Sequence, residues 1–324
     1  MTMTATAVEA TELRKTYPGD VKALDGLSIS VEQGEIFGML GPNGAGKSTT
    51  IRILTTLSRP DSGKASVAGA DVLSSPDEVR RRIGVVAQGS GVDPVATGRE
   101  NLMLQGRVYG MRGAALRRRV DELLERFRLA KAADRPARTY SGGMQRRLDI
   151  ALGMIHSPQV LFLDEPTTGL DPEVRADMWE MIRRLVTDDG LTVLLTTHYM
   201  DEADRLADRV AIVDGGRVVA EGTPEALKSD LEGDAVHIEL AEPQAADRAR
   251  ELLSRVTANG TQVEGKTVRA RVRAGAEAVP RILTALDGAG IAVASVTVSR
   301  PSLDDVYFRH TGRSLAAAEE GEDK

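Results

Sequence analysis

Short apolar runs alternate with longer amphipathic segments from Val8 to about Leu231. Five runs are rich in β-branched and other apolar residues, and segments with helical spacing lie between them. They cover residues 35–40, 82–88, 159–164, 191–198 and 209–214. Strands that are apolar on both faces are typical of a parallel sheet covered by helices on each side. The pattern therefore predicts an α/β domain with a buried, largely parallel sheet.

One part of this region has no strand pattern. Between residues 100 and 134 the apolar positions recur every three or four residues, as in LRRRVDELLERFRL, which predicts helices with a basic outer face. We interpret that face as a solvated surface rather than as an anion-binding site.

The pattern changes again at Ala235. From there the segments read strand, helix, two strands joined by a turn at residues 264–266, helix and strand, which predicts a ferredoxin-like α+β domain. A short helix is expected at Ser302, because Asp305 stands three residues after this capping residue. We place this domain at residues 235–312 and expect flexible tails at residues 1–7 and 314–324.

Composition narrows the classes of function. The 324 residues are enough for about two domains, and a net charge of −6 with 3% aromatic residues argues against a nucleic-acid-binding protein. The chain has no Cys, which excludes disulfides and zinc-thiolate sites. Its longest uncharged run has 14 residues, below the roughly 20 that a membrane helix needs, and no secretory signal is found. We expect an intracellular protein.

Residues 41–48 read GPNGAGKS and follow a predicted strand, which is the pattern of a phosphate-binding loop. Its glycines allow backbone N–H groups to surround phosphate oxygens, Lys47 supplies a positive charge, and Ser48 is a candidate Mg²⁺ ligand. The candidate phosphate-binding residues are Gly41, Asn43, Gly44, Ala45, Gly46, Lys47, Ser48 and Thr49.

Polar side chains follow three other predicted strands. Asp164 and Glu165 end one strand, and we expect Asp164 to hold Mg²⁺ and its water while Glu165 acts as general base on an attacking water. His198 ends a second strand and is a candidate to contact the γ-phosphate. Gln88 ends a third strand and is a candidate to contact Mg²⁺ or its water. Carboxyl ends of parallel strands meet at one edge, so these residues can converge on the phosphate loop.

Two further segments are weaker candidates. Tyr17 stands beside a turn, where its ring could stack on a purine, although a packing role is the more common one. Ser141, Gly142 and Gly143 precede a predicted helix and form either a plain helix start or a second phosphate-shaped pocket.

The phosphate loop, Gln88, SGGMQRR, FLDEPTTGLDP and His198, in this order and spacing, resemble the nucleotide-binding subunit of an ATP-binding cassette (ABC) transporter over about residues 8–231. The segments QGSGVDPVATGRENL, TYSGGMQRRLDIA and PSLDDVYFRHTG are similar to the daunorubicin-resistance type of drug-exporter ATPase. Tyr140 and Met144 depart from the residues usual in the SGG motif but leave its Ser and glycines intact.

The resemblance implies a P-loop NTPase fold: a RecA-like mixed-sheet core with a helical subdomain at about residues 100–155. It also implies that two copies pair head to tail, with Ser141 and Gly143 of one copy contacting the γ-phosphate held by the other. In the same way it assigns adenine stacking to Tyr17, the catalytic carboxylate to Glu165 and communication across the dimer to Asp171.

By this resemblance we expect a subunit that binds ATP and Mg²⁺, hydrolyses ATP and powers export of a hydrophobic drug, antibiotic or lipid. The path across the membrane would lie in a separate integral membrane permease, with this chain as a homodimer on its cytoplasmic face and no nucleic-acid partner. The alternative is a non-transport ABC ATPase of translation or DNA repair. A nucleotide-gated switch would suit a chain without Glu165 or His198, and both are present.

Overall fold

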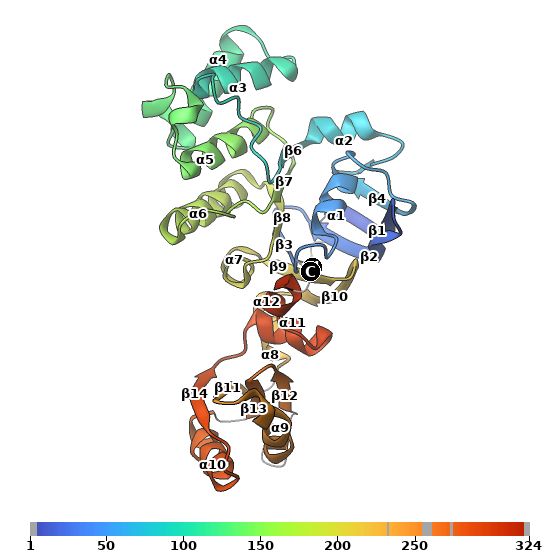
Figure 1. Cartoon of the computed structure of the whole chain (residues 1–324). Helices are drawn as coiled ribbons and strands as arrows, with labels where there is room; N and C mark the ends of the chain where they lie inside the picture. The colour runs from blue at the N-terminus through green and yellow to red at the C-terminus, as the bar shows by residue number, and fades with distance from the viewer. Residues whose placement is uncertain (1–4, 232, 255–260, 273–274, 321–324) are drawn as a thin grey trace. The chain divides into compact units, whose positions relative to one another are not determined.

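The computed structural model describes residues 5–231, 233–254, 261–272 and 275–320. It divides into two compact units, Met1–Gly222 and Thr223–Lys324 (Figure 1). No helix in the described ranges has the length and the apolar character that crossing a bilayer requires.

The first unit is built on a six-stranded sheet with the order β10-β9-β3-β8-β7-β6. Five of its strands are parallel, and β10 pairs with β9 in the antiparallel direction. This confirms the predicted largely parallel sheet. The strands are β3 (Ile36–Leu40), β6 (Ile83–Val86), β7 (Val160–Asp164), β8 (Thr192–Thr197), β9 (Arg209–Asp214) and β10 (Arg217–Gly222).

Side chains alternate across this sheet and form a separate core on each face. Phe162 of β7 packs on one face with α1 (Lys47–Leu54) and β1 (Thr6–Tyr17), while Leu163 packs on the other with α5 (Gly142–Gly153) and α6 (Pro172–Asp189). Helices α1 and α5 therefore lie on opposite faces of the sheet (Figure 1). Helix α7 (Met200–Leu206) follows β8.

The first face is also covered by an antiparallel sheet that the sequence pattern did not predict, with the order β2-β1-β4-β5. Exposed polar residues interrupt the apolar ones along β1, and its pairing with β2 shifts register several times. Glu12 in β1 even has a φ of +53°. The other elements here are β2 (Val21–Glu32), β4 (Ser62–Val67), β5 (Ala70–Asp71) and α2 (Pro76–Arg82).

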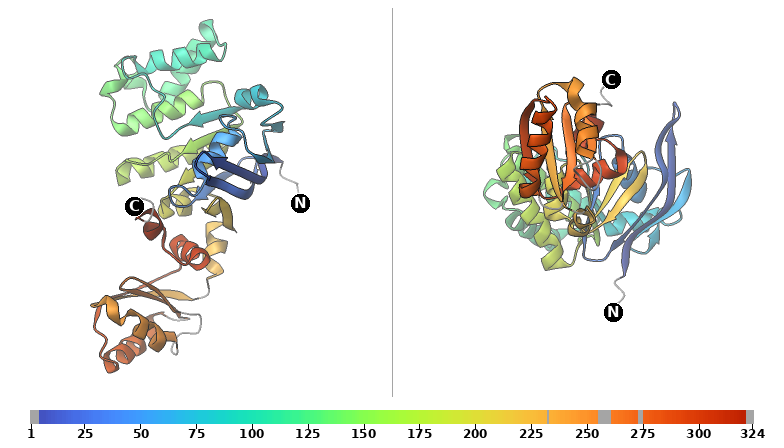
Figure 2. Two further views of the ribbon diagram at one scale, coloured as in Figure 1. Left: turned by 45° about the vertical axis from the view of Figure 1, so that its right-hand side comes forward. Right: turned by 90° about the horizontal axis from the view of Figure 1, so that it is seen from below.

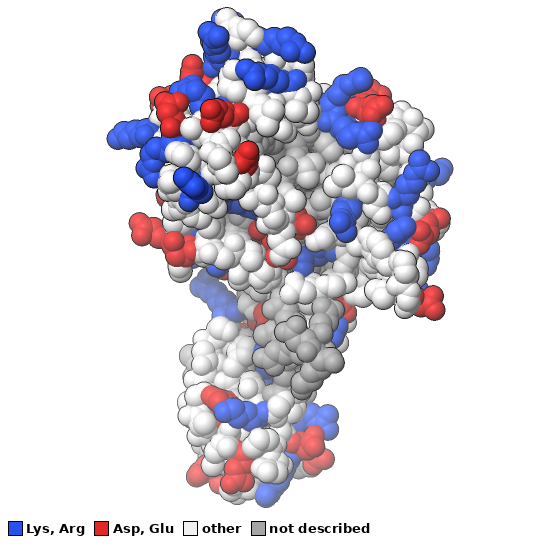
Figure 3. Space-filling model, turned by 45° about the horizontal axis from the view of Figure 1, so that its top comes forward, with Lys and Arg blue, Asp and Glu red and all other residues white. Residues whose placement is uncertain are grey.

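Helices α3 (Gly98–Val108), α4 (Gly113–Arg126) and α5 form the predicted helical subdomain. Thr97 and Glu100 make a capping box at the start of α3, and α4 buries its predicted apolar stripe. Arg117 and Arg118 are exposed on the outer face of α4. Figure 3 shows Lys and Arg side chains spread over this part of the first unit, with Asp and Glu among them.

The second unit has the predicted β-α-β-β-α-β order, and its sheet, β12-β13-β11-β14, is antiparallel throughout. Helices α9 and α10 cover one face with apolar side chains (Figure 2). The elements are β11 (Asp234–Leu240), α9 (Ala246–Ser254), β12 (Thr261–Glu264), β13 (Thr267–Val272), α10 (Gly275–Gly288) and β14 (Val293–Ser299). Helix α11 (Leu303–Thr311) follows, with Ser302 and Asp305 as the predicted capping box.

The boundaries differ from those expected from the sequence. The second unit begins at Thr223, because Thr223 caps α8 (Pro224–Ser229) and this helix packs against α11. Strand β1 begins at Thr6, inside the expected N-terminal tail. Residues 315–320 form helix α12 instead of a tail, because Leu315 and Ala318 are buried. Residues 1–4 and 321–324 of the expected tails lie outside the described residues.

Candidate functional site

The glycine-rich loop joins β3 to α1, as the sequence predicts, and two of its glycines are required by close backbone approaches. A Cβ on Gly41 would lie 2.2 Å from the carbonyl oxygen of Val213, and Gly46, with a φ of +107°, would meet the carbonyl oxygen of Ala23 at 2.6 Å. The loop therefore packs tightly against the backbone of β9 and of β2 where it leads into α1.

Lys47 is buried, with 4% of its surface exposed. Its Nζ donates hydrogen bonds to the carbonyl oxygens of Gly41 at 2.6 Å and Pro42 at 2.8 Å, and lies 4.0 Å from Oε1 of Glu165. The ammonium group is thus held over the loop, next to the carboxylate. Of the other predicted loop residues, Asn43, Gly44 and Ser48 are exposed, Thr49 is half-buried and Ala45 is buried.

The predicted metal ligands come together only in part. Oδ1 of Asp164 accepts hydrogen bonds from Ser48 Oγ at 3.1 Å and from Thr196 Oγ1 at 2.6 Å. This pair offers a hydroxyl and a carboxylate, the oxygen ligands that Mg²⁺ prefers, and leaves other positions for water and phosphate. Gln88 instead donates from Nε2 to Oε2 of Glu165 at 3.2 Å.

Glu165 lies at the centre of the site, with 9% of its surface exposed. Its Oε2 accepts hydrogen bonds from Gln88 and from Thr168 Oγ1, each at 3.2 Å, and its Oε1 lies 3.4 Å from Nδ1 of His198. The neighbouring His198 lowers the pKa of the Glu165 carboxyl below its usual 4.5, against the opposing effect of burial. Glu165 is therefore a carboxylate at neutral pH, the form that a general base requires.

The remaining predicted residues lie at element ends. Ser141 caps α5 by accepting a hydrogen bond from the Met144 N–H at 3.3 Å, and Asp171 caps α6 through the Val174 N–H. A Cβ on Gly143 would meet Val174 at 2.5 Å, which explains the glycine and fixes this turn against α6. Gly142 is exposed beside it. The turn is carried by α5, on the face of the sheet opposite to α1.

Tyr17 ends β1 at a hairpin and pairs with Val21 at the start of β2. It is half-buried, and Lys15 Nζ lies 5.7 Å from the centre of its ring. The same β2 strand reaches the phosphate loop a few residues later, where Ala23 and Leu24 limit the space at Gly46. The hairpin thus brings Tyr17 to the neighbourhood of the loop.

Sequence reasoning missed two threonines of the site. Thr196 bonds Asp164, and its Oγ1 also accepts a hydrogen bond from the Glu165 N–H at 3.1 Å, while Thr168 bonds the Glu165 carboxylate. A signal for Thr196 is present in the sequence, since it is a polar residue within the apolar strand LTVLLTTH, two positions before His198.

A buried glutamate connects the segments around the site. Glu202 of α7 is fully buried, and its Oε1 accepts hydrogen bonds from Thr167 Oγ1 and Trp179 Nε1, both at 2.8 Å. Burial raises the pKa of the Glu202 carboxyl. Thr167 stands two residues after Glu165, and Trp179 lies on α6, so Glu202 joins α7 to both segments.

We expect Glu202→Ala to lower the free energy of unfolding by roughly 2–4 kcal/mol, because each buried donor left unpaired costs about 1–3 kcal/mol. Urea unfolding followed by the fluorescence of Trp179, the one tryptophan of the chain, measures this loss. Asp201→Ala is the control, since its side chain is 57% exposed, and it should shift stability by less than about 0.5 kcal/mol. Equal stability of the two variants would contradict the role of Glu202.

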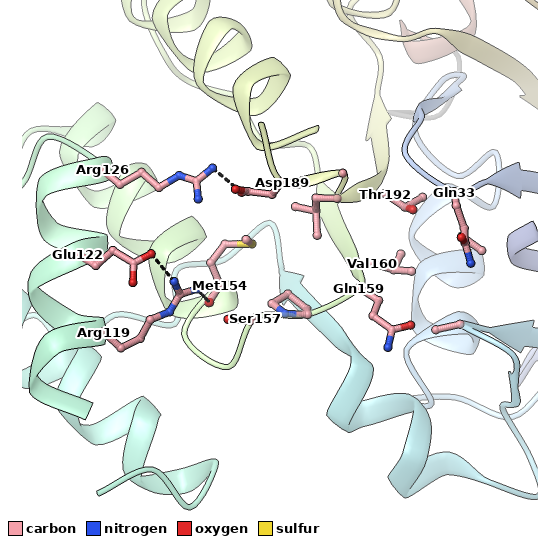
Figure 4. Close-up of a pocket in the computed structure, with 15 residues that line it drawn as sticks. Gln33, Arg119, Glu122, Arg126, Met154, Ser157, Gln159, Val160, Asp189 and Thr192 are labelled. Atoms are coloured by element: carbon pink, nitrogen blue, oxygen red, sulfur yellow. Dashed lines mark hydrogen bonds and ion pairs between the residues drawn. The ribbon is translucent and has the colours of Figure 1, made fainter. Parts of the chain in front are cut away.

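A cavity of about 500 Å³ opens at the other end of the parallel strands. Its wall includes Val160 and Thr192, the first residues of β7 and β8, and the Arg126–Asp189 ion pair (Figure 4). Arg119 of α4 lies in this wall and bonds the backbone near the end of α5. The phosphate loop, Gln88, Asp164, Glu165 and His198 follow the opposite, carboxyl ends of the parallel strands, so this cavity is separate from their site.

The site and fold agree with known families. The ABC transporter family model matches residues 24–168, and the model of the C-terminal domain of DrrA1-3-like ATP-binding proteins matches residues 222–311. Daunorubicin resistance ATP-binding protein DrrA2 of Streptomyces coeruleorubidus is 48% identical over 309 residues, which cover 94% of this chain and 95% of that protein. Nod factor export ATP-binding protein I of Burkholderia orbicola is 42% identical over 97% of this chain and 99% of its own.

A solved structure of an ATP-binding cassette resembles the first unit. The ATP-binding cassette MJ0796, solved as a dimer in a post-hydrolysis state with ADP and Pi, superposes with a TM-score of 0.61. It is 29% identical and covers 67% of this chain and 98% of its own. A phosphate loop and a buried carboxylate at the strand ends, together with relatives that match nearly the whole length, establish that the chain belongs to the ATP-binding subunits of ABC transporters, in the daunorubicin-resistance group.

Proposed function

We propose that this chain hydrolyses ATP at the carboxyl edge of its central sheet and thereby powers a membrane exporter. The observation that carries the proposal is the position of the Glu165 carboxylate, which is buried, ionised and 4.0 Å from Lys47 on the phosphate loop. A carboxylate beside a phosphate-binding cation can accept the proton of a water that attacks the terminal phosphate.

The loop residues bind the phosphates in this proposal. Backbone N–H groups from Asn43 to Thr49, at the N-terminus of α1, surround the phosphate oxygens, and Lys47 exchanges its loop carbonyls for the β- and γ-phosphates. Tyr17, on the hairpin beside the loop, stacks on the adenine.

Ser48 and Asp164 would hold Mg²⁺, since their oxygens already lie 3.1 Å apart at the loop. Bound there, the ion would neutralise charge on the phosphates. Gln88 would contact the water shell of Mg²⁺ only after its amide gives up the hydrogen bond that it donates to Glu165 in this structure.

Glu165 acts as the general base, and the groups around it fix its two oxygens. Thr168 and Gln88 donate to Oε2, and Oε1, which faces Lys47 and His198, would receive the proton of the attacking water in place of its contact with His198. His198 then donates a hydrogen bond to the γ-phosphate from its ring.

Two copies of the chain would share each ATP. The Ser-Gly-Gly turn at the start of α5 has the geometry of a phosphate-binding helix start, yet α5 packs on the face of the sheet opposite to α1. We therefore infer that Ser141 and Gly143 bind the γ-phosphate held by the other copy, and that Asp171, which caps α6 beside this turn, lies at the same interface. The dimeric state of MJ0796 supports this inference.

The membrane path belongs to a separate permease, on whose cytoplasmic face the dimer would sit. The names of the relatives, a daunorubicin resistance ATP-binding protein and a Nod factor export ATP-binding protein, support export of a hydrophobic drug, antibiotic or lipid. The helical subdomain and the segment after Gln88 are the expected contacts with the permease.

Doxorubicin accumulation in a drug-sensitive bacterium tests this function. Cells that express the chain together with its permease, sought among the products of the neighbouring reading frames, should retain less of the fluorescent drug than cells with the permease alone, because ATP hydrolysis drives export. Lys47→Ala in place of the parent chain is the matched control and should restore full accumulation. Equal accumulation with both chains, for doxorubicin and for a panel of hydrophobic drugs, antibiotics and lipids, would count against an exporter and favour a non-transport ATPase.

A further inference from the structure

Arg146 of α5 bonds the backbone around Glu165 and does not bond the oxygens of the Glu165 carboxylate. Its surface is 9% exposed, and its guanidinium donates to four backbone carbonyls. Nη1 bonds the Ala87 oxygen at 2.8 Å, Nε bonds Pro166 at 2.8 Å, and Nη2 bonds Asp164 at 3.0 Å and Glu165 at 3.1 Å. One side chain therefore holds the residue before Gln88 and the three consecutive residues that include Glu165.

The backbone conformation of Glu165 is unfavourable and has to be stabilised by its surroundings. Glu165 has a φ of +48°, in the left-handed region that residues with a side chain rarely adopt. This conformation turns its side chain toward Gln88 and Lys47, because the chain bends sharply at the end of β7. Arg146 bonds the carbonyls on both sides of the bend, and a planar guanidinium with five N–H donors is suited to this task.

A second residue of α5 holds the other end of the Gln88 segment. Asp149 is three positions after Arg146, on the same side of the helix, and is 7% exposed. Its Oδ1 accepts hydrogen bonds from Ser90 Oγ at 3.0 Å and from the Gly91 N–H at 2.9 Å. Gln88 is thus fixed on both sides by the helix that begins at the Ser-Gly-Gly turn.

We propose that Arg146 is a positioning residue for ATP hydrolysis, which holds the backbone of Glu165 and Gln88 so that their side chains meet at the phosphate loop. The inference rests on the proposed role of Glu165 as base. It concerns the rate of the hydrolytic step and not the binding of ATP, because the bonds of Arg146 go to these two segments and not to the loop at residues 41–48.

Arg146→Lys is the test, measured as phosphate release and as affinity for a fluorescent ATP analogue on the full chain. A lysine keeps the charge but has one compact ammonium, which cannot reach carbonyls on both sides of the bend. A displacement of about 1 Å in a catalytic group can lower a rate by about 100-fold, so we expect kcat to fall about 10- to 100-fold while the dissociation constant for ATP changes less than about twofold. Arg146→Gln, which buries no unpaired charge, carries the same expectation if the lysine variant does not fold.

Arg119→Lys is the matched control. Arg119 also bonds two backbone carbonyls, those of Met154 at 2.7 Å and Ile155 at 3.2 Å, but it lies in the wall of the distant cavity (Figure 4). Its kcat should stay within about twofold of the parent. A comparable loss in Arg119→Lys, or a folded Arg146 variant that loses affinity as much as rate, would overturn the positioning role.

Glu165→Gln separates this inference from the proposed function. If Glu165→Gln is slow and Arg146→Lys is as fast as the parent, only the inference fails. If Glu165→Gln keeps the parent rate, the assignment of the base fails, and the inference that rests on it fails too. Because Arg146 acts through Glu165, adding Arg146→Lys to Glu165→Gln should slow hydrolysis by no more than about twofold, and a fully additive loss would contradict the inference.

Discussion

Lys47→Ala is expected to weaken ATP binding about 100-fold or more. Each hydrogen bond to a charged group contributes about 1.5–3 kcal/mol, and Lys47 is the cation that the loop holds in place through Gly41 and Pro42. Without it, the charge of the β- and γ-phosphates would meet the loop's N–H dipoles alone. Titration with a fluorescent ATP analogue measures the loss.

Lys64→Ala is the control for this experiment. Lys64 is an exposed residue of β4 in the same unit, so its removal should leave the affinity within about twofold of the parent. Thermal unfolding shows whether Lys47→Ala is folded. Unchanged affinity in a folded Lys47→Ala protein would mean that the phosphates bind somewhere other than the glycine-rich loop.

The central sheet was predictable because its strands are apolar on both faces. Phe162 and Leu163 are neighbours in the sequence and enter different cores, so the run has no polar interruption and stands out among helical segments. The antiparallel sheet has one solvated side and irregular pairing. Its strand β1 is bent at Glu12, so its apolar residues do not alternate strictly with polar ones.

The sequence predicts those site residues that stand at the ends of strands of one parallel sheet. Asp164, Glu165 and the loop converge because the carboxyl ends of such strands share an edge. Gln88 was placed at this edge too, but its amide bonds the Glu165 carboxylate and not Asp164 or Ser48. This contact depends on the bend of the backbone at Glu165.

Other contacts depend on how distant segments pack. Arg146 looks in the sequence like one of two adjacent basic residues in a helix, and only its burial shows that it bonds carbonyls from two loops. Glu202 likewise looks like a surface residue of a polar helix, but α7 turns it into the core beside Trp179. Such roles follow from tertiary packing, which local periodicity does not encode.

Glu165→Gln is expected to lower the rate of ATP hydrolysis by about 10²–10⁴-fold, the usual contribution of a general base, while ATP affinity stays near that of the parent. Glutamine can keep the hydrogen bonds to Gln88 and Thr168 through its amide oxygen, but it cannot accept the proton of the attacking water. Phosphate release and fluorescent ATP binding measure the two quantities. Glu180→Gln, on the exposed side of α6, is the control and should stay within about twofold of the parent rate.

The same variant tests the shared site. ATP that is bound and not hydrolysed would join the phosphate loop of one copy to Ser141 of the other, so the Glu165→Gln dimer should accumulate with ATP and not with ADP. Size-exclusion chromatography measures this shift from monomer to dimer, and adding Ser141→Arg should abolish it, because a large side chain at the helix start blocks the approach of the γ-phosphate. Hydrolysis at the parent rate would show that Glu165 is not the base. Slow hydrolysis without an ATP-dependent dimer would leave the base in place and contradict the sharing of the site by two isolated subunits.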